Sequence, residues 1–255
     1  MADTVVYVYA VTEAAIAETL DAAAIVGIGG APVRRVVSGG LAAVVSPVDA
    51  TRFSEEALRR SLEDLQWLED IARAHHAVVA AVARSGPVAP VRLATVYLDE
   101  ANVRALLDDR AAGFAAALDR IRGRTEWGVK AFAARAEGGA EPPAADAARP
   151  GTSYLMRRRA ERDRAARGHQ DAVDAAEAVH REISTVAVAS RRYPPQDPRL
   201  SGHREEMVLN AAYLVDQVGA DALRRLVEDD RAAQSLRMEL TGPWAPYSFA
   251  TLDEP

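Results

Sequence analysis

The residues of this 255-residue chain that could carry chemistry are a glycine-rich loop, five histidines and an arginine-rich segment. The loop reads GIGGAP over residues 27–32 and has the outline of a dinucleotide-binding turn. Such a turn needs a third glycine and a helix N-terminus that receives the pyrophosphate. Here Pro32 stands at the third glycine position, and a strand-like run follows it. We therefore interpret the loop as a turn that needs positive φ, and not as a nucleotide site.

The histidines lack the spacing of a metal site. The chain has no HExxH motif and no cysteine, and the adjacent His75 and His76 would point about 100° apart on a helix. Because His75 falls on the apolar stripe of its predicted helix, we expect a buried, hydrogen-bonded core histidine. His169 and His180 would share a helix face only in an unbroken helix, and we predict a break near Gly168.

Motifs of nucleophilic catalysis are also missing. No serine lies in a GxSxG elbow or in an SxxK motif. Carboxylate pairs such as Asp108-Asp109 fall on helix turns that we expect to face solvent. We therefore expect that the protein is not an enzyme, and we assign no catalytic residue, metal or cofactor.

The segment YLMRRRAERDRAAR, residues 154–167, could form a phosphate-binding stripe on a helix. Glu161 and Asp163 interrupt this stripe, and the chain as a whole has a formal net charge of −6. An acidic chain is poorly suited to bind nucleic acid. We interpret the segment as a solvated helix face or a surface for an acidic protein partner, and expect no nucleic acid partner.

The composition is that of a soluble globular protein. Hydrophobic residues make up 49% and charged residues 27%, which excludes wholesale disorder. Without cysteine there are no disulfides and no thiolate ligands. No apolar run approaches the ~20 residues of a membrane helix, and the N-terminus lacks a basic signal-peptide region. We expect a cytoplasmic protein that does not contact a membrane.

The first half of the chain has the pattern of an α+β domain. Alternating apolar residues indicate strands, with Gly39-Gly40 as a hairpin turn, and apolar stripes at helical spacing indicate helices. Ser54 and Asp99 are suitable N-caps. The predicted elements are strands at 4–11, 33–38 and 41–48, one continuous helix at 54–84, a strand at 88–98 and a helix at 99–121.

The second half predicts the order β-α-β-β-α-β. This is the ferredoxin-like order, in which two helices cover one face of a four-stranded antiparallel sheet. The predicted elements are a strand at 126–135, a surface loop at 137–150, a helix at 153–186, a strand at 184–194, a loop at 194–203, a strand at 205–216, a helix at 220–236 and a strand at 236–242. We therefore predict two α+β domains, at 1–123 and 124–241, followed by a C-terminal tail at 242–255.

Residues 240–249 read LTGPWAPYSF, a concentration of glycine, proline and aromatics in a chain with 5% aromatics. This segment is similar to the LTGPWPPYSF signature that closes proteins of the gas vesicle GvpL/GvpF family. Ala245 stands where this signature has its second proline. Elsewhere in the chain, Leu93-Ala94 stands where the family more commonly has phenylalanine-glycine. Other stretches resemble the family in the same order: YVYAVT, GLAAVVSPV, LxWLxxxAxxHxxVV, GPVAPVRLATVY, EWGVKAF, GTSYLMRRR and MVLNAAYLVD.

The resemblance implies a non-enzymatic accessory or structural protein of gas vesicle assembly. It implies association with the hydrophobic shell protein GvpA and with other gas vesicle accessory proteins, at the gas vesicle or in the cytoplasm. It also implies a ferredoxin-like C-terminal domain and a tail packed between the two domains. From the residues alone, a ferredoxin-like small-ligand-binding regulatory module and an enzyme that uses His75 stay open as alternatives.

The tail supplies most of the candidate contact residues. Its prolines fix φ near −65°, so that the chain must leave the last strand as an extended segment. Its aromatic side chains would each bury roughly 150–250 Å², and we expect them to be packed. The expected contacts, between the domains or with a partner, come from the tail and from the LxWLxxxAxxHxxVV helix: Gly242, Pro243, Trp244, Pro246, Tyr247, Phe249, Trp67 and His75.

Overall fold

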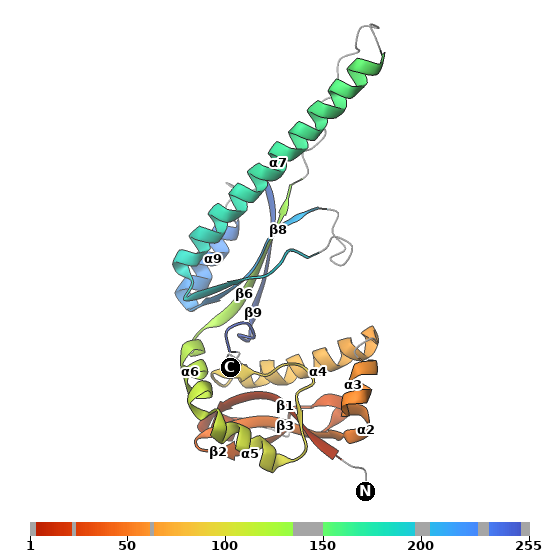
Figure 1. Ribbon diagram of the computed structural model, residues 1–255. Helices are drawn as coiled ribbons and strands as arrows, with labels where there is room; N and C mark the ends of the chain where they lie inside the picture. The colour runs from red at the N-terminus through yellow and green to blue at the C-terminus, as the bar shows by residue number, and fades with distance from the viewer. Residues whose placement is uncertain are drawn as a thin grey trace. The chain divides into compact units, whose positions relative to one another are not determined.

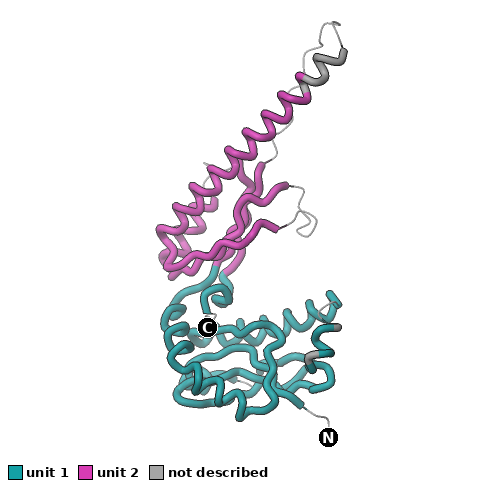
Figure 2. The backbone as a smooth tube through the Cα atoms, viewed as in Figure 1, with its two compact units in different colours: residues 1–126, 243–255 teal, residues 127–242 magenta. Residues whose placement is uncertain are grey.

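The computed structural model describes residues 4–21, 24–61, 64–134, 150–196, 205–228 and 235–250. The chain forms two compact units, which Figure 2 distinguishes by colour. Unit 1 comprises residues 1–126 and 243–255, and unit 2 comprises residues 127–242. The C-terminal segment therefore belongs to the same unit as the N-terminal half of the chain.

Unit 1 is built on a five-stranded sheet with β1 at its centre. The sheet order is β2-β3-β1-β4, and β5 also pairs with β1. β1 runs antiparallel to β3, from Thr4 opposite Asp49 to Glu13 opposite Leu41. The strands are β1 (Thr4–Glu13), β2 (Arg34–Ser38), β3 (Leu41–Asp49), β4 (Val88–Pro90) and β5 (Val96–Tyr97).

β1 is buried on both faces, as its two-sided apolar pattern predicted. Tyr7, Val8 and Tyr9 have no exposed surface. Figure 1 shows α4 (Leu65–Ala83) on one side of the sheet and α5 (Glu100–Asp109) on the other. A strand between two helical layers has no solvated face, so its apolar residues do not alternate with polar ones.

The predicted hairpin is confirmed between β2 and β3. Gly39 and Gly40 have φ values of 56° and 87° and connect Ser38 to Leu41, which pair across the turn. Two consecutive positive φ angles are what a tight two-residue hairpin needs, and glycine adopts them without steric cost.

The helices of unit 1 are shorter than the apolar stripes predicted. The continuous helix predicted at 54–84 is wrong, because α4 begins anew after Asp64. The Asp64 carboxylate caps it by accepting hydrogen bonds from the N–H groups of Gln66 and Trp67, at 3.0 and 3.2 Å. The other helices are α1 (Ala14–Thr19), the 3-10 turn η2 (Ile28–Gly30), α2 (Ala50–Phe53), α3 (Glu55–Ser61) and α6 (Ala111–Ile121).

Two further predictions for unit 1 need correction. The helix predicted from Asp99 to Ile121 divides into α5 and α6 at Arg110, whose φ and ψ of −110° and 15° are not helical. Asp99 does cap α5 as predicted. The single strand predicted at 88–98 divides into β4 and β5, because Ala94 between them has a φ of 63° and cannot continue a strand.

Unit 2 contains a four-stranded sheet in the order β7-β8-β6-β9. Its helices pack on the sheet around buried residues such as Ala176, Ile183, Tyr213 and Leu223. Unit 2 holds most of β6 and β9, whose ends extend into unit 1. The elements follow the order β6 (Thr125–Ala133), α7 (Pro150–Val186), β7 (Ala189–Arg192), β8 (Met207–Val215), α9 (Gln217–Glu228) and β9 (Leu236–Trp244).

Two predictions for unit 2 are wrong. α7 continues through Gly168, because one glycine costs only about 1 kcal/mol in a helix rich in alanine and arginine. β9 continues through Pro243 to Trp244, which an edge strand allows because an outward-facing position needs no N–H donor. The loops predicted at 137–150 and 194–203 lie mainly outside the described residues; Pro150 begins α7, and β8 begins only at Met207.

The N-terminal half of α7 has no partner surface among the described residues of unit 2. Among the described side chains of this helix, Ala172 is the first that is buried, and those from Arg158 to Asp171 are all exposed. In Figure 1 this part of α7 extends beyond the sheet. The described arginines of the predicted stripe, from Arg158 to Arg167, are therefore all exposed, in agreement with the interpretation as a solvated face.

Candidate functional site

The part of the C-terminal tail that the structure describes within unit 1, residues 243–250, packs against the middle of α4. The indole of Trp244 lies edge-on to the ring of His76, with ring centroids 5.4 Å apart. Tyr247 stacks on His76 at 6.2 Å, and its ring lies 6.3 Å from that of His75. Phe249 is buried, with 7% of its surface exposed. Two consecutive histidines of α4 thus form the platform on which the tail rests.

A buried carboxylate fixes the tail from the other side. Glu126 is 9% exposed, and its two carboxylate oxygens accept hydrogen bonds from Ser248, at 2.7 Å from the backbone N–H and at 2.5 Å from the hydroxyl. Hydrogen bonds to a charged acceptor are stronger than neutral ones. Glu126 is the last residue of unit 1 before the chain enters unit 2. The bond therefore joins the exit of the chain from unit 1 to the segment that returns.

His75 is a core histidine, as its place on the apolar stripe predicted. It is 3% exposed, and its Nδ1 lies 3.0 Å from the hydroxyl oxygen of Tyr7. That oxygen also accepts a hydrogen bond from the N–H of Ala94 at 2.9 Å, so the Tyr7 hydroxyl links the imidazole to the backbone between β4 and β5. Nε2 of the ring has no hydrogen-bond partner of normal geometry among the described residues.

Burial is also the main influence on the acidity of His75. It lowers the pKa of the ring to about 4, with His76 acting in the same direction and the backbone of Val91 in the opposite one. Burial raises the pKa of Tyr247, and the charge of Glu126 adds to this. The side chains of His75 and Tyr247 are therefore neutral near pH 7. The polar group that faces Nδ1 of His75 is the hydroxyl of Tyr7.

The remaining candidate residues have separate positions. Trp67 lies near the N-terminal end of α4, about two turns before His75, and packs on Phe53 at a centroid distance of 6.1 Å. Gly242 has a φ of 124°, a conformation that favours glycine. Pro246 is buried, and its carbonyl accepts hydrogen bonds from the N–H groups of Phe249 and Ala250 in a turn.

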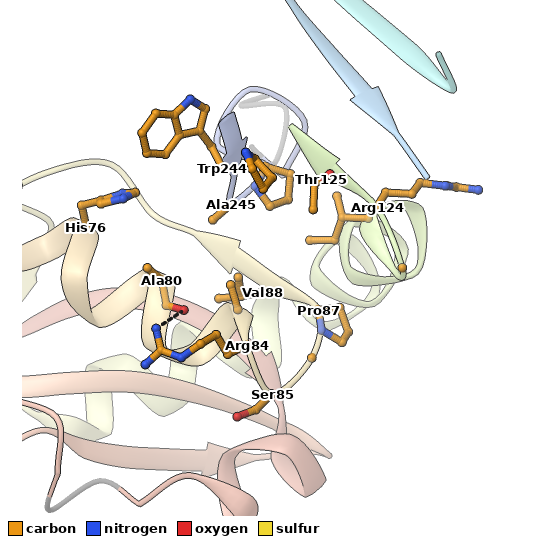
Figure 3. A pocket seen from close by; sticks show the side chains of 16 residues that line it. His76, Ala80, Arg84, Ser85, Pro87, Val88, Arg124, Thr125, Trp244 and Ala245 are labelled. Atoms are coloured by element: carbon orange, nitrogen blue, oxygen red, sulfur yellow. Dashed lines mark hydrogen bonds between the residues drawn. The ribbon is translucent and has the colours of Figure 1, made fainter. Parts of the chain in front are cut away.

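Trp244 departs from the expectation that the tail aromatics are packed. It is 44% exposed, whereas Phe249 is buried. Its indole forms one wall of a cavity of about 570 Å³ in unit 1, shown in Figure 3. The cavity is lined by the second half of α4, the turn that follows it, the end of α6, the start of β6 and the tail.

The GIGGAP loop is the turn that its glycines predicted. Gly29 and Gly30 have φ values of 63° and 79°. The hydroxyl of Tyr9 accepts a hydrogen bond from the N–H of Ile28 at 2.9 Å. A Cβ atom on Gly27 would lie 2.6 Å from that hydroxyl oxygen, so this position needs glycine for close approach. The loop is thus fixed to the core by a buried tyrosine.

The family model of the gas vesicle synthesis proteins GvpL/GvpF matches residues 5–251 of this chain. The chain belongs to the GvpL/GvpF family. Gas vesicle protein L of Streptomyces sp. (strain CB03234) is 44% identical over 255 residues, which are 99% of this chain and 95% of that protein. Gas vesicle protein F of the same strain is 28% identical over 230 residues, 86% and 87% of the two chains.

Solved structures agree with this fold. The crystal structure of GvpF from Anabaena sp. PCC7120 superimposes with a TM-score of 0.68 at 20% identity, covering 98% of both chains. The structure of GvpF from Microcystis aeruginosa gives a TM-score of 0.64 at 19% identity, covering 97% of this chain and 99% of that one. At these identities the likeness concerns the fold alone.

In the described part of the chain, no three His, Asp or Glu side chains are grouped so that they could hold a metal ion. No described helix is long and apolar enough to cross a membrane. The family resemblance that the terminal signature carried is confirmed.

Two residues that complete the site, Glu126 and Tyr7, could not be predicted from local patterns. Glu126 lies in a predicted strand next to Trp127, and nothing in a lone glutamate there indicates a buried acceptor for Ser248. Tyr7 is one of two tyrosines on the same face of β1, and its bond to His75 spans 68 residues. The unusual Leu93-Ala94 pair was a signal of an unusual backbone conformation at this position, because Ala94 is the only described non-glycine residue with positive φ.

Proposed function

We propose that this protein is a non-enzymatic assembly factor or structural component of gas vesicles that binds the shell protein GvpA. The observation that carries the proposal is the family match over residues 5–251, together with relatives that are themselves named gas vesicle proteins L and F. Other gas vesicle accessory proteins are further partners under this proposal, and the protein acts at the gas vesicle or in the cytoplasm.

A physical reason for such a factor lies in the shell protein. The resemblance implies a strongly apolar shell subunit, and exposed apolar surface costs about 25 cal/mol per Å² in water. Large exposed apolar patches lead to aggregation before assembly. A protein that covers this surface until the subunit joins the wall removes that hazard. The edge strand β7 of unit 2, with three of its four residues exposed, is able to accept a further strand.

We also propose that unit 2 is a ferredoxin-like domain and that the tail acts as a clamp between the domains. The order of its elements and the sheet order β7-β8-β6-β9 support the ferredoxin-like assignment. The position of Glu126 and Ser248 supports the clamp: both lie in unit 1, and their hydrogen bonds tie the segment that leads into unit 2 to the segment that returns from it.

Co-purification with GvpA tests the central proposal. Tagged protein and GvpA are produced together, and the tagged protein is recovered at physiological salt. We expect GvpA in the eluate, and none with a tagged acidic control protein of similar size. Duplex DNA should bind only weakly and with a steep salt dependence. Tight DNA binding without recovery of GvpA would contradict the proposed partner.

A further inference from the structure

The cavity in unit 1 has the size and the lining of a ligand site. Its volume of about 570 Å³ lies within the range of roughly 300–1,000 Å³ that is typical of small-molecule pockets. Ala80, Ala83 and Val88 give it an apolar floor, and Figure 3 shows the rings of His76 and Trp244 on one side. The floor and this side of the cavity therefore offer apolar and aromatic surface to a bound group.

The only charged side chains in the described lining are two arginines. Arg84 and Arg124 line the cavity, and none of its described lining residues is acidic. Arg84 Nη1 donates to the carbonyl of Ala80 at 3.4 Å, and Arg124 donates in the same way to the carbonyl of Arg120. Among the described residues, neither guanidinium has a carboxylate partner within ion-pair distance. In a chain of net charge −6, two such arginines beside one cavity are a local positive site.

Helix C-termini at the cavity do not cancel this charge. α4 ends at Ala83 and α6 ends at Ile121, and the free carbonyls of a helix end amount to about half a negative charge that falls off within one turn. Each arginine uses one of its five N–H donors on such a carbonyl. The other donors of each guanidinium stay available for a bidentate bond to a carboxylate.

The partly exposed indole of Trp244 is a second feature of the cavity. The indole is 44% exposed, although the neighbouring Ala245 and Pro246 are buried. An exposed indole beside an apolar floor leaves area that a ligand group would remove from water. The hydrogen bonds between Glu126 and Ser248 fix the rest of the tail. The indole of Trp244 therefore keeps its position although it is not buried.

We propose that this cavity binds an amphiphilic carboxylate, with an apolar group against Trp244 and the floor and the carboxylate on Arg84. Arg124 also lines the cavity, but in Figure 3 its side chain points away from Trp244, so it contributes a more distant positive charge. A glutamate or aspartate beside a leucine-like residue in a polypeptide presents this chemistry, and so does a small branched-chain carboxylic acid. The inference depends on the cavity alone and holds whether or not GvpA is a partner.

Isothermal titration with three probes tests the proposal. The probes are the capped dipeptide N-acetyl-Leu-Glu-amide, its uncharged counterpart N-acetyl-Leu-Gln-amide and 4-methylpentanoate. We expect a Kd on the order of 100 μM for the glutamate peptide, in line with the ligand efficiency of small ligands. The glutamine peptide should bind roughly tenfold more weakly, because it lacks the charge-assisted hydrogen bonds. Binding of 4-methylpentanoate as tight as that of the peptide would assign the site to a small molecule; binding of the peptide alone would assign it to a polypeptide.

Variants locate the binding. Arg84→Gln should weaken the glutamate peptide roughly tenfold, Arg124→Gln about threefold, and both should leave the glutamine peptide unchanged. Arg164→Gln, which removes an exposed guanidinium from α7 in unit 2, is the matched control and should have no effect. Ala80→Phe fills the cavity and should abolish binding. Circular dichroism and the melting temperature report whether each variant is folded. Equal affinity for the two peptides, equal affinity of parent and Arg84→Gln, or no binding of any probe to the parent would each overturn the proposal.

Discussion

Acidification should destabilise unit 1 through His75, and the size of the effect follows from the burial of this ring. His75 is 3% exposed and has a pKa of about 4 in the folded protein, against about 6.5 in an unfolded chain. Its folded pKa is thus depressed, and the unfolded state takes up the proton first. The contribution of His75 to stability is therefore complete above pH 6.5 and is lost as the pH falls towards 4.

The expected loss can be estimated from these two values. At pH 7 the imidazole is almost neutral in both states, and at pH 5 it is protonated mainly in the unfolded one. Linkage then lowers the free energy of unfolding by about 2 kcal/mol between pH 7 and pH 5. Carboxylates titrate over part of the same range, and their contribution has to be removed by comparison with a variant.

Urea unfolding of the parent and of His75→Gln at pH 7, 6 and 5 provides this comparison. The carboxylates are common to both proteins, so the difference in their free energies of unfolding should shrink by about 2 kcal/mol from pH 7 to pH 5. Tyr7→Phe is the matched control: it removes the hydroxyl at Nδ1 but keeps His75 buried, and should retain most of the pH dependence. A constant difference between parent and His75→Gln over this range would refute the assignment of the low pKa to burial.

The other predictions concern the tail, its anchors and the strained turn. Ala94→Gly should raise the free energy of unfolding by about 0.5–1 kcal/mol in chemical denaturation, because glycine adopts the φ of 63° without the cost that alanine bears. Ser248→Ala should lower it by about 1–2 kcal/mol through the lost hydrogen bond to Glu126. Ser38→Ala, which removes an exposed hydroxyl bond to Asp108 at 2.6 Å, is the comparison and should cost less. Phe249→Ala should cost about 3 kcal/mol and, if the tail is a clamp, speed limited proteolysis near residue 123; unchanged cleavage there would contradict the clamp. Folded His75→Gln should still support vesicle formation in cells, since the ring is a core residue, and loss of vesicles would show otherwise.

Local patterns predicted most of the elements and failed where a break depends on one residue. The hairpin at Gly39-Gly40 and the cap at Asp99 could be predicted because each needs a residue type with few alternatives. The break before α4 could not be predicted, because the apolar stripe continues across it and only the capping bonds of Asp64 mark the new start. The break expected at Gly168 was wrong for the opposite reason, since a single glycine is tolerated in a strong helix.

The site was predicted only in its aromatic half. The signature around Trp244 and Phe249 indicated that the tail must pack somewhere, and Phe249 does. Of the partners of the tail, His75 was among the expected contact residues, whereas Glu126 in its strand and His76 carried no local signal. Their roles arise because residues far apart in the sequence come together in the fold: the bond of Glu126 to Ser248 spans 122 residues. Single-sequence periodicity contains no information on such pairs.

This distance in sequence has a consequence for how unit 1 is stabilised. Unit 1 includes residues 243–255, so it is complete only when the chain has passed through the whole of unit 2. The entropy of closing so long a loop is reduced if unit 2 folds first, because its structure then brings the ends of β6 and β9 into one sheet, where they are neighbours. The tail can then reach Glu126 and α4 at low further cost. On this reasoning the sheet of unit 2 prepares the tail for docking on unit 1, where the buried Glu126 at the start of β6 receives it.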